Sequence, residues 1–203
     1  MGRDKSDGIA MLALEFPGCD RLFAMIDDAL AAGDEHAVTA AIREGMCRAM
    51  REQSVALPEC CHEPVADHYA RRELYRCEKN GYSVVAMTWG PGQGTPIHDH
   101  AGCWCVEGVW RGELEITQYE LRERDGDRFR FETVATERAG VGSAGCLIPP
   151  HEYHAIRNPS DTEIAISLHI YRAPLLTCAH FQADGQPGWY RKLDRTLSLD
   201  AAA

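Results

Sequence analysis

Residues 82–112, YSVVAMTWGPGQGTPIHDHAGCWCVEGVWRG, carry the pattern that decides the fold. Two runs rich in β-branched and aromatic residues, 82–89 and 103–110, lie on either side of a stretch rich in glycine and proline. Runs of this length and composition are typical of strands, and glycine and proline are typical of the connections between strands. The segment therefore predicts two short strands joined by an irregular connection that contains His98 and His100.

The same alternation of strand-like runs and turn residues extends from residue 69 onward. Asn80-Gly81 and Asp125-Gly126 lie between such runs, where glycine accepts the positive φ of a tight hairpin turn. Many short strands at similar spacing predict a mainly β protein, either a sandwich or a small barrel able to hold one small ligand. The other strands are expected at residues 73–77, 113–121, 129–136, 146–148, 153–157 and 163–171, and the tail 174–203 is expected to lie over the barrel.

The first third of the chain predicts helices. Apolar residues recur at helical spacing between residues 22 and 30 and again between residues 37 and 50, where Asp34 is a candidate N-cap. Residues 53–68 contain two prolines and are expected to form an irregular connection. We expect one domain overall, in which a helical segment, residues 1–68, packs on a barrel formed by residues 69–203.

Composition limits the partners and the compartment. The chain has 203 residues and a formal net charge of −10, which argues against nucleic acid or an anionic membrane as the main partner. Residues 1–8 lead into no apolar secretory segment, and no run of about 18 apolar residues is present. Nine cysteines, an odd number, are then expected to be thiols in a reducing cytoplasm.

His98 and His100 carry the most informative chemistry. Residues i and i+2 of a strand face the same side, so both imidazoles can bind one metal while Asp99 points away. Histidine ligands with open coordination positions suit iron that activates O2, and they also suit zinc that activates water. The two histidines alone do not distinguish these metals.

The spacing around the two histidines resembles the first motif of the cupin superfamily, G(x)5HxH(x)4E(x)6G. Gly92 and Gly112 occupy the glycine positions, and Cys105 stands where the motif has its glutamate ligand. The resemblance implies a jelly-roll barrel with a metal inside.

A second cupin motif, PxGxxHxxxN, is similar to the segment that ends at Asn158. Pro149 is in place, but His151 replaces the motif's glycine. The resemblance implies that His154 is the third metal ligand, and His151 is the alternative.

Residues 89–100, WGPGQGTPIHDH, resemble the metal-binding segment of thiol dioxygenases, specifically the cysteine dioxygenase type I family. Residues 167–171, SLHIY, and residues 177–181, TCAHF, extend this resemblance over about residues 69–181. The resemblance implies Fe(II) as the cofactor and a hydrogen-bonded row of side chains beside it. The implied metal ligands are His98, His100 and His154, and the implied row is Ser167, His169 and Tyr171, whose spacing puts them on one strand face.

The resemblance also implies a substrate-binding pair and a modification. Tyr69-Ala70-Arg71 is similar to the family's Tyr-x-Arg, whose arginine binds the substrate carboxylate. Arg72 is the alternative if the alignment slips by one residue. An arginine rather than a glutamine at this place favours cysteine over 3-mercaptopropionate as the substrate.

The resemblance further implies that Cys105 matches a cysteine that becomes thioether-linked to the active-site tyrosine, here Tyr171. The alternative is that Cys105 is a buried unmodified thiol.

The function implied is a non-haem Fe(II) dioxygenase that adds O2 to the sulfur of L-cysteine and forms cysteine sulfinic acid. The partners are then a small thiol and O2, and the oligomeric state stays open. Three alternatives remain: a dioxygenase for 3-mercaptopropionate or mercaptosuccinate, a non-catalytic metal-binding cupin module, and a zinc isomerase or hydrolase. Met87, Trp89 and Ile156 are expected as cavity walls, whereas five histidines are expected to be structural or on the surface: His36, His62, His68, His151 and His180.

Overall fold

The computed structural model describes residues 14–202, so the absence of a secretory segment predicted for residues 1–8 lies outside the described residues. Three helical elements come first: α1 (Cys19–Leu30), α2 (Glu35–Arg51) and the short 3-10 helix η1 (Glu59–His62). The strands follow: β1 (Ala70–Cys77), β2 (Tyr82–Trp89), β3 (Ile97–His98), β4 (Cys105–Arg111), β5 (Glu113–Asp125), β6 (Arg128–Gly140), β7 (Ala144–Leu147), β8 (His154–Arg157), β9 (Ala165–Tyr171), β10 (Thr177–Ala183) and β11 (Trp189–Thr196).

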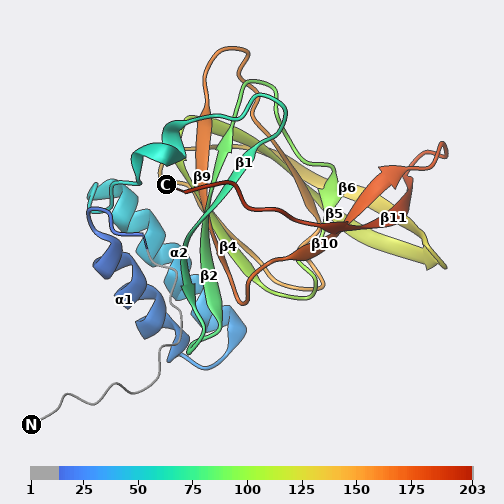
Figure 1. Cartoon of the computed structure of the whole chain (residues 1–203). Coiled ribbons are helices and arrows are strands. Elements are labelled where there is room, and N and C mark those ends of the chain that lie inside the picture. The colour runs from blue at the N-terminus through green and yellow to red at the C-terminus, as the bar shows by residue number, and fades with distance from the viewer. Residues whose placement is uncertain (1–13, 203) are drawn as a thin grey trace, which may run out of the picture.

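Two sheets form the barrel (Figure 1). The first has the strand order β1-β2-β9-β4-β7, and the second closes on itself in the order β10-β11-β6-β5-β8-β3. All of the strand pairs within them are antiparallel. The prediction of a mainly β, cupin-type barrel with a short helical N-terminal segment is thereby confirmed.

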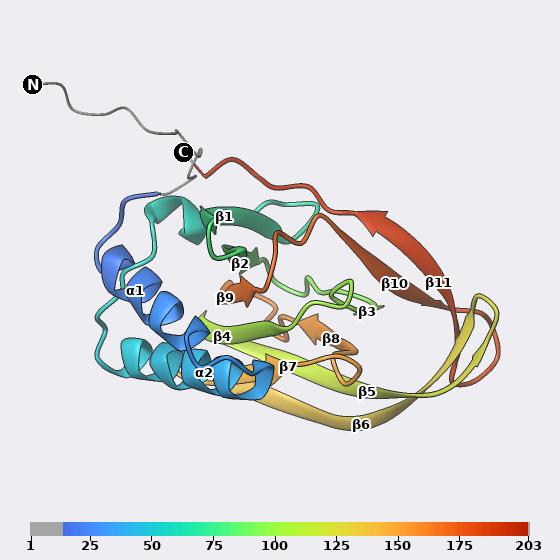
Figure 2. The same cartoon turned by 90° about the horizontal axis from the view of Figure 1, so that it is seen from below.

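The two long helices cover the outer face of the five-stranded sheet, while the long strands of the second sheet extend away from them (Figure 2). Asp34 is the N-cap of α2, as predicted, because its carboxylate accepts a hydrogen bond from Ala37 N at 3.0 Å. Ile42 and Met46 on α2 belong to one core cluster with the side chains of Ile166, Leu168 and Ile170 on β9. Since side chains alternate along a strand, the odd-numbered residues of β9 face the barrel interior.

The central strands of the five-stranded sheet have nearly continuous apolar sequences because both faces of the sheet are buried. Every residue of β2 and of β9 is buried, because helices cover one face of the sheet and the barrel interior covers the other. The interior face of this sheet is therefore the surface on which a site can be built.

Gly112, the last glycine of the first cupin motif, has a clear structural purpose. Its φ is +72°, and a Cβ placed on it would lie 2.8 Å from Ile164 O. Asn158, the last residue of the second motif, donates hydrogen bonds from its amide to Trp89 O, Gly90 O and Glu163 O. Both residues hold the loops that bring the ends of the strands together.

The structure corrects the prediction for the tail. Residues 177–183 and 189–196 form strands β10 and β11 of the closed sheet, and only the residues after 196 lie along the outside of the barrel as expected. The sequence of β11 is polar and charged because most of its side chains are exposed, and it therefore lacks the apolar pattern by which a strand is predicted.

Two further differences concern strand lengths. β3 was not predicted, since it has only two residues. Strands β5 and β6 reach residues 125 and 140, beyond the predicted ends, as a long hairpin.

Other predictions were close to the observed elements. Both helices were predicted within a few residues of their observed ends, and Gly81 and Gly126 have positive φ in the expected turns.

Among the described residues, no helix combines the length and the apolar composition needed to cross a membrane. The assignment of residues 1–68 and 69–203 to one domain stays a prediction.

Candidate metal centre and substrate cavity

Three histidines converge inside the barrel. His98 is the last residue of β3 and pairs directly with His154, the first residue of β8, while His100 follows two residues after His98. One ring nitrogen from each of the three lies within 4.8 Å of the others. The strand pairing therefore brings together the three side chains that the resemblance nominated.

Backbone carbonyls orient two of these rings. His154 Nδ1 lies 2.8 Å from Glu152 O, and His98 Nδ1 lies 3.2 Å from Pro96 O. A carbonyl only accepts, so each Nδ1 carries a hydrogen and each Nε2 keeps its lone pair in the neutral ring. A backbone partner of this kind is what commonly holds a metal-binding histidine in place.

The donor set fits a divalent transition metal. Burial holds the pKa values of His98 and His100 well below the ordinary histidine value, so both rings are neutral donors near pH 7. His154 Nε2 and His100 Nδ1 are buried without a hydrogen-bond partner among residues 14–202. Buried polar atoms ordinarily have partners, so nitrogen atoms in this state indicate a ligand such as a metal ion.

A hydrogen-bonded row runs beside the histidines on β9. Trp89 Nε1 donates to Ser167 Oγ at 2.8 Å, and Ser167 Oγ lies 2.7 Å from His169 Nε2. Burial lowers the pKa of His169 to about 4, so the ring is neutral at pH 7. Because Ser167 accepts from the indole, its own hydroxyl hydrogen is available to His169 Nε2, and His169 Nδ1 then carries a hydrogen.

Tyr171 and Cys105 lie directly opposite each other in the register of β9 and β4. Both side chains are fully buried, and burial raises both pKa values well above their ordinary values. The phenol and the thiol are therefore protonated near neutral pH. Cys103, the neighbouring cysteine, is outside β4 and partly exposed.

Arg71 and Arg72 point to different surroundings. Arg71 lines a small cavity with Tyr69, His98 and Tyr171, and its Nη1 and Nη2 each donate to a backbone carbonyl, of Ser198 and Leu175 respectively.

Arg72 binds protein groups with three side-chain nitrogens and lines none of the described cavities that contain the histidines. Its partners are Ala201 O, Thr88 Oγ1 and Glu63 O. Of the two arginines, Arg71 is the one placed beside the histidines.

The cavity at this site is small, about 20 Å³, and its walls include Met87, Trp89 and Ile156, as expected. Tyr69 stacks on Trp89 with ring centroids 4.6 Å apart. His180, which was expected to be structural or on the surface, also lines this cavity and pairs with His98 across β10 and β3. The sequence prediction missed this because it did not identify β10 as a barrel strand.

Glu107 was missed altogether. Its side chain is 7% exposed, and its Oε2 lies 3.6 Å from His154 Nε2 and 3.4 Å from His169 Nδ1. Burial favours the neutral acid, but the electrostatic interaction with His154 outweighs burial and holds the pKa of Glu107 below its ordinary value. Glu107 in turn raises the pKa of His154 against the opposing effect of burial. The available signal was its position two residues after Cys105 on the same strand, which places both on one face.

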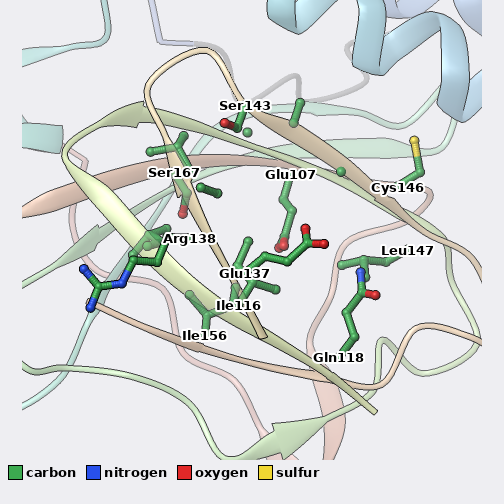
Figure 3. Close-up of a pocket in the computed structure, with 16 residues that line it drawn as sticks. Glu107, Ile116, Gln118, Glu137, Arg138, Ser143, Cys146, Leu147, Ile156 and Ser167 are labelled. Atoms are coloured by element: carbon green, nitrogen blue, oxygen red, sulfur yellow. The ribbon is translucent and has the colours of Figure 1, made fainter. Parts of the chain in front are cut away.

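A second cavity of about 200 Å³ opens on the other side of Glu107 (Figure 3). The Glu107 side chain extends into it from β4, and Gln118, Glu137 and Arg138 line it from β5 and β6. Ser167 and Ile156 also line it, and Ile156 is shared with the small cavity that contains Arg71 and His98.

Comparison with known proteins gives one family. Cysteine dioxygenase type I matches residues 65–184 of the chain. The curated cysteine dioxygenase type 1 of Danio rerio is 31% identical over 139 residues, and those of Homo sapiens and Rattus norvegicus are 28% and 27% identical over 138 and 136 residues. Each alignment covers 64% of this chain and 66% of the relative, so the chain spans slightly under two thirds of the length of these proteins.

Two of the solved structures that match the chain have lower sequence identity. The TT1209 protein of Thermus thermophilus is 18% identical, with a TM-score of 0.43 over 56% of this chain and 90% of that chain. Oxalate oxidase in complex with the substrate analogue glycolate is 19% identical, with a TM-score of 0.42 over 54% of this chain and 53% of that chain.

Proposed function

The chain belongs to the cysteine dioxygenase type I family, and from this we propose that it is a non-haem iron thiol dioxygenase that converts L-cysteine and O2 into cysteine sulfinic acid. The observation that carries the proposal is the convergence of His98, His100 and His154 within 4.8 Å, next to a buried guanidinium and a buried phenol. A metal-binding module without catalysis has no need of the second and third of these groups.

Fe(II) is the proposed cofactor, and His98, His100 and His154 are the residues that would hold it. Neutral nitrogen donors with open positions are the ligand type used by iron sites that activate O2. Bound iron would supply the redox chemistry with O2 and would lower the pKa of a coordinated thiol.

Arg71 is proposed to bind the substrate carboxylate. Each of its two terminal nitrogens donates one N–H to a backbone carbonyl and therefore retains a second N–H for a ligand. Two parallel N–H groups match the two oxygens of a carboxylate. The carbonyls of Leu175 and Ser198 hold the guanidinium in place before substrate arrives, and this lowers the entropic cost of binding.

Tyr171 is proposed to donate a hydrogen bond to the reacting oxygen or sulfur. Its raised pKa keeps the hydroxyl protonated, so it can act as a donor at neutral pH. Ser167 and His169 are proposed to hold the β9 side of the cavity rigid through the chain of hydrogen bonds that begins at Trp89.

The test is oxygen uptake by the Fe(II)-loaded protein with L-cysteine, 3-mercaptopropionate and mercaptosuccinate assayed in parallel. We expect cysteine to be consumed with an equal amount of O2 and sulfinic acid to be the product. The His154→Ala variant is the matched control and should take up no O2 above background. Turnover of another thiol but not of cysteine would contradict the substrate, and no turnover of any thiol would contradict the activity.

A further inference from the structure

The residues that follow β11 form part of the small cavity that contains Arg71 and His98. Residues 197–202, which we call the strap, have no helix or strand of their own and run back past β1 (Figure 2). They lie outside residues 65–184, the part of the chain that matches the family. The proposed reaction uses only the Ser198 carbonyl of the strap, so its other residues have no assigned role.

The strap holds Arg71 at three points. Arg71 N donates to Asp200 Oδ2 at 2.8 Å, and Asp200 N donates to Arg71 O at 2.7 Å. Ser198 O accepts a third hydrogen bond, from Arg71 Nη1 at 3.0 Å. The strap therefore fixes both the backbone and the guanidinium of the residue that is proposed to bind the substrate carboxylate.

Leu197, the first residue of the strap, is part of the cavity wall. Its side chain lines the small cavity together with Arg71 and His98, and it packs against the core cluster that contains Tyr171. Because this side chain is only partly buried, it lies between the cavity and solvent. Leu197 N also donates to Leu176 O at 2.8 Å, which ties the strap to the loop before β10.

The size of the cavity requires a wall to move when a substrate binds. A cavity of about 20 Å³ holds roughly one water molecule, and L-cysteine is several times larger. Most wall residues belong to barrel strands, where a displacement would disturb the strand pairing. Leu197 is outside the strands and partly exposed, so its side chain can turn toward solvent with little loss of packing.

We propose that the strap limits the length of the substrate through Leu197 and, through Asp200, positions the Arg71 guanidinium that receives the substrate carboxylate. This assignment rests on the proposed function, in which the sulfur binds at the metal and the carboxylate at Arg71. With both ends of the substrate held, rotation of the Leu197 side chain makes room for L-cysteine. A longer thiol has to displace the strap backbone as well, and it breaks the hydrogen bonds to Leu176 and Arg71.

The length limit is tested by anaerobic titration of the Fe(II)-loaded protein, because thiols then bind without being oxidised. L-Homocysteine is the probe, since it has the polar groups of L-cysteine and one additional methylene. The wild type should bind L-cysteine about 10-fold or more tighter than L-homocysteine, the usual effect of one methylene that does not fit. Leu197→Ala should reduce this preference by about 10-fold, because the shorter side chain leaves space for the methylene.

Leu199→Ala is the matched control. Leu199 is also a leucine of the strap, but it is 40% exposed and lines neither of the two cavities described above. This variant should keep the wild-type preference. Both affinities refer to the same folded population, so a loss of stability cancels in their ratio. An unchanged preference in Leu197→Ala, an equal change in both variants, or a wild type that binds both thiols equally would overturn the role of Leu197.

The positioning of Arg71 is tested with a thiol that has no carboxylate. Asp200→Ala removes an acceptor of the Arg71 backbone and should weaken L-cysteine binding about 3- to 10-fold, the effect of one hydrogen bond. Cysteamine, which lacks the carboxylate, should bind to this variant as it binds to the wild type. Asp200→Asn retains an acceptor oxygen and should restore most of the affinity for L-cysteine. Equal weakening of both thiols in Asp200→Ala, or full L-cysteine affinity in that variant, would refute the positioning role.

The two proposals fail separately. If the variants change thiol binding as expected but the iron-loaded protein consumes no O2, the dioxygenase function fails and the role of the strap stands. If L-cysteine is oxidised while Leu197→Ala and Asp200→Ala bind thiols like the wild type, the role of the strap fails and the function stands.

Discussion

Arg71 and Arg72 are adjacent in the chain, and the pleat of β1 sends them to different surroundings. Arg71 retains free N–H groups in the small cavity, whereas Arg72 is occupied by three protein acceptors. At the residue scale, a change of one position along a strand therefore separates the arginine proposed to bind substrate from one that binds only protein groups.

We predict that Arg71→Gln raises the KM for cysteine by about 10- to 100-fold with a smaller effect on kcat, because a hydrogen-bonded charge pair contributes roughly 1.5–3 kcal/mol. Arg72→Gln is the control. It should lower the unfolding temperature, since it leaves buried acceptors without partners, and should leave KM near the wild-type value. Steady-state oxygen uptake measures both, and an unchanged KM in Arg71→Gln would remove Arg71 from the carboxylate role.

Cys105 and Tyr171 are opposite each other on β4 and β9, which is the arrangement that a thioether link between them requires. We predict that iron and O2 convert this pair to a thioether: the sulfur bonds to a ring carbon, the thiol and the ring each lose a hydrogen, and O2 is the oxidant. Intact-protein mass spectrometry should show the loss of a pair of hydrogens. Cys105→Ser should show no such loss, and an unchanged wild-type mass after turnover would indicate an unmodified thiol.

At the scale of elements, the last residues of the chain hold β1 in place. Asp200 accepts a hydrogen bond from Arg71 N at 2.8 Å, and Asp200 N donates to Arg71 O at 2.7 Å. His68 Nε2 lies 3.0 Å from Asp200 Oδ1. The residues after β11 therefore lie alongside β1, and they supply one of the carbonyls that orient the Arg71 guanidinium.

This contact predicts a pH dependence. Hydrogen bonds to Asp200 and then Asp67 raise the pKa of His68, so its stabilising effect is complete below about pH 6.5 and is lost as the pH rises through the raised value. We expect His68→Gln to lower the unfolding temperature at pH 5.5 and to leave it nearly unchanged at pH 9. Because the His68 side chain is 46% exposed, the effect at pH 5.5 should be small.

His62→Gln is a suitable control for this measurement. His62 is an exposed histidine in η1, and its contact is with Arg111 rather than with a carboxylate. Its replacement should give the same small change at both pH values. A His68→Gln effect that is equal at pH 5.5 and pH 9 would exclude the His68–Asp200 pair as the origin of the pH dependence.

At the scale of the whole molecule, the candidate site is assembled from both sheets. His98 and His154 come from the closed sheet, whereas Arg71, Glu107, His169 and Tyr171 come from the inner face of the five-stranded sheet. A metal bound by the three histidines would therefore lie between the closed sheet and the inner face of the five-stranded sheet.

We predict that metal binding stabilises the entire barrel. A ligand at 100 times its dissociation constant adds about 2.7 kcal/mol to the free energy of unfolding, which corresponds to a rise of roughly 5–10 °C in unfolding temperature for a chain of this size. A chelator should reverse the rise. His98→Ala should show no rise with metal, and equal stabilisation of the wild type and this variant would place the metal elsewhere.

The local sequence pattern was sufficient to predict several elements of this protein. The helical face of α2, its Asp34 cap, most of the strands and the turns at Gly81 and Gly126 follow from periodicity and backbone preference, which are properties of short segments. His98 and His100 were identifiable from their spacing of two residues, although β3 ends at His98 and His100 lies in the loop that follows. Resemblance to a family then nominated His154, Arg71 and the β9 row.

The tertiary structure decided which strands pair and which side chains lie side by side in the site. β11 is a strand because β10 and β6 pair with it, although its own sequence is polar, and His180 faces the cavity because β10 pairs with β3. The local signal for Glu107, its position two residues after Cys105, indicates the face of the strand but not the burial of the carboxylate. Only the register of β4 against β9, and the helices that cover the opposite face of that sheet, bury its carboxylate beside His154 and His169. The sequence alone determined most of the strands and pointed to His98 and His100, because these are properties of short segments. The long-range strand pairing determined β10, β11 and the electrostatic surroundings of the site.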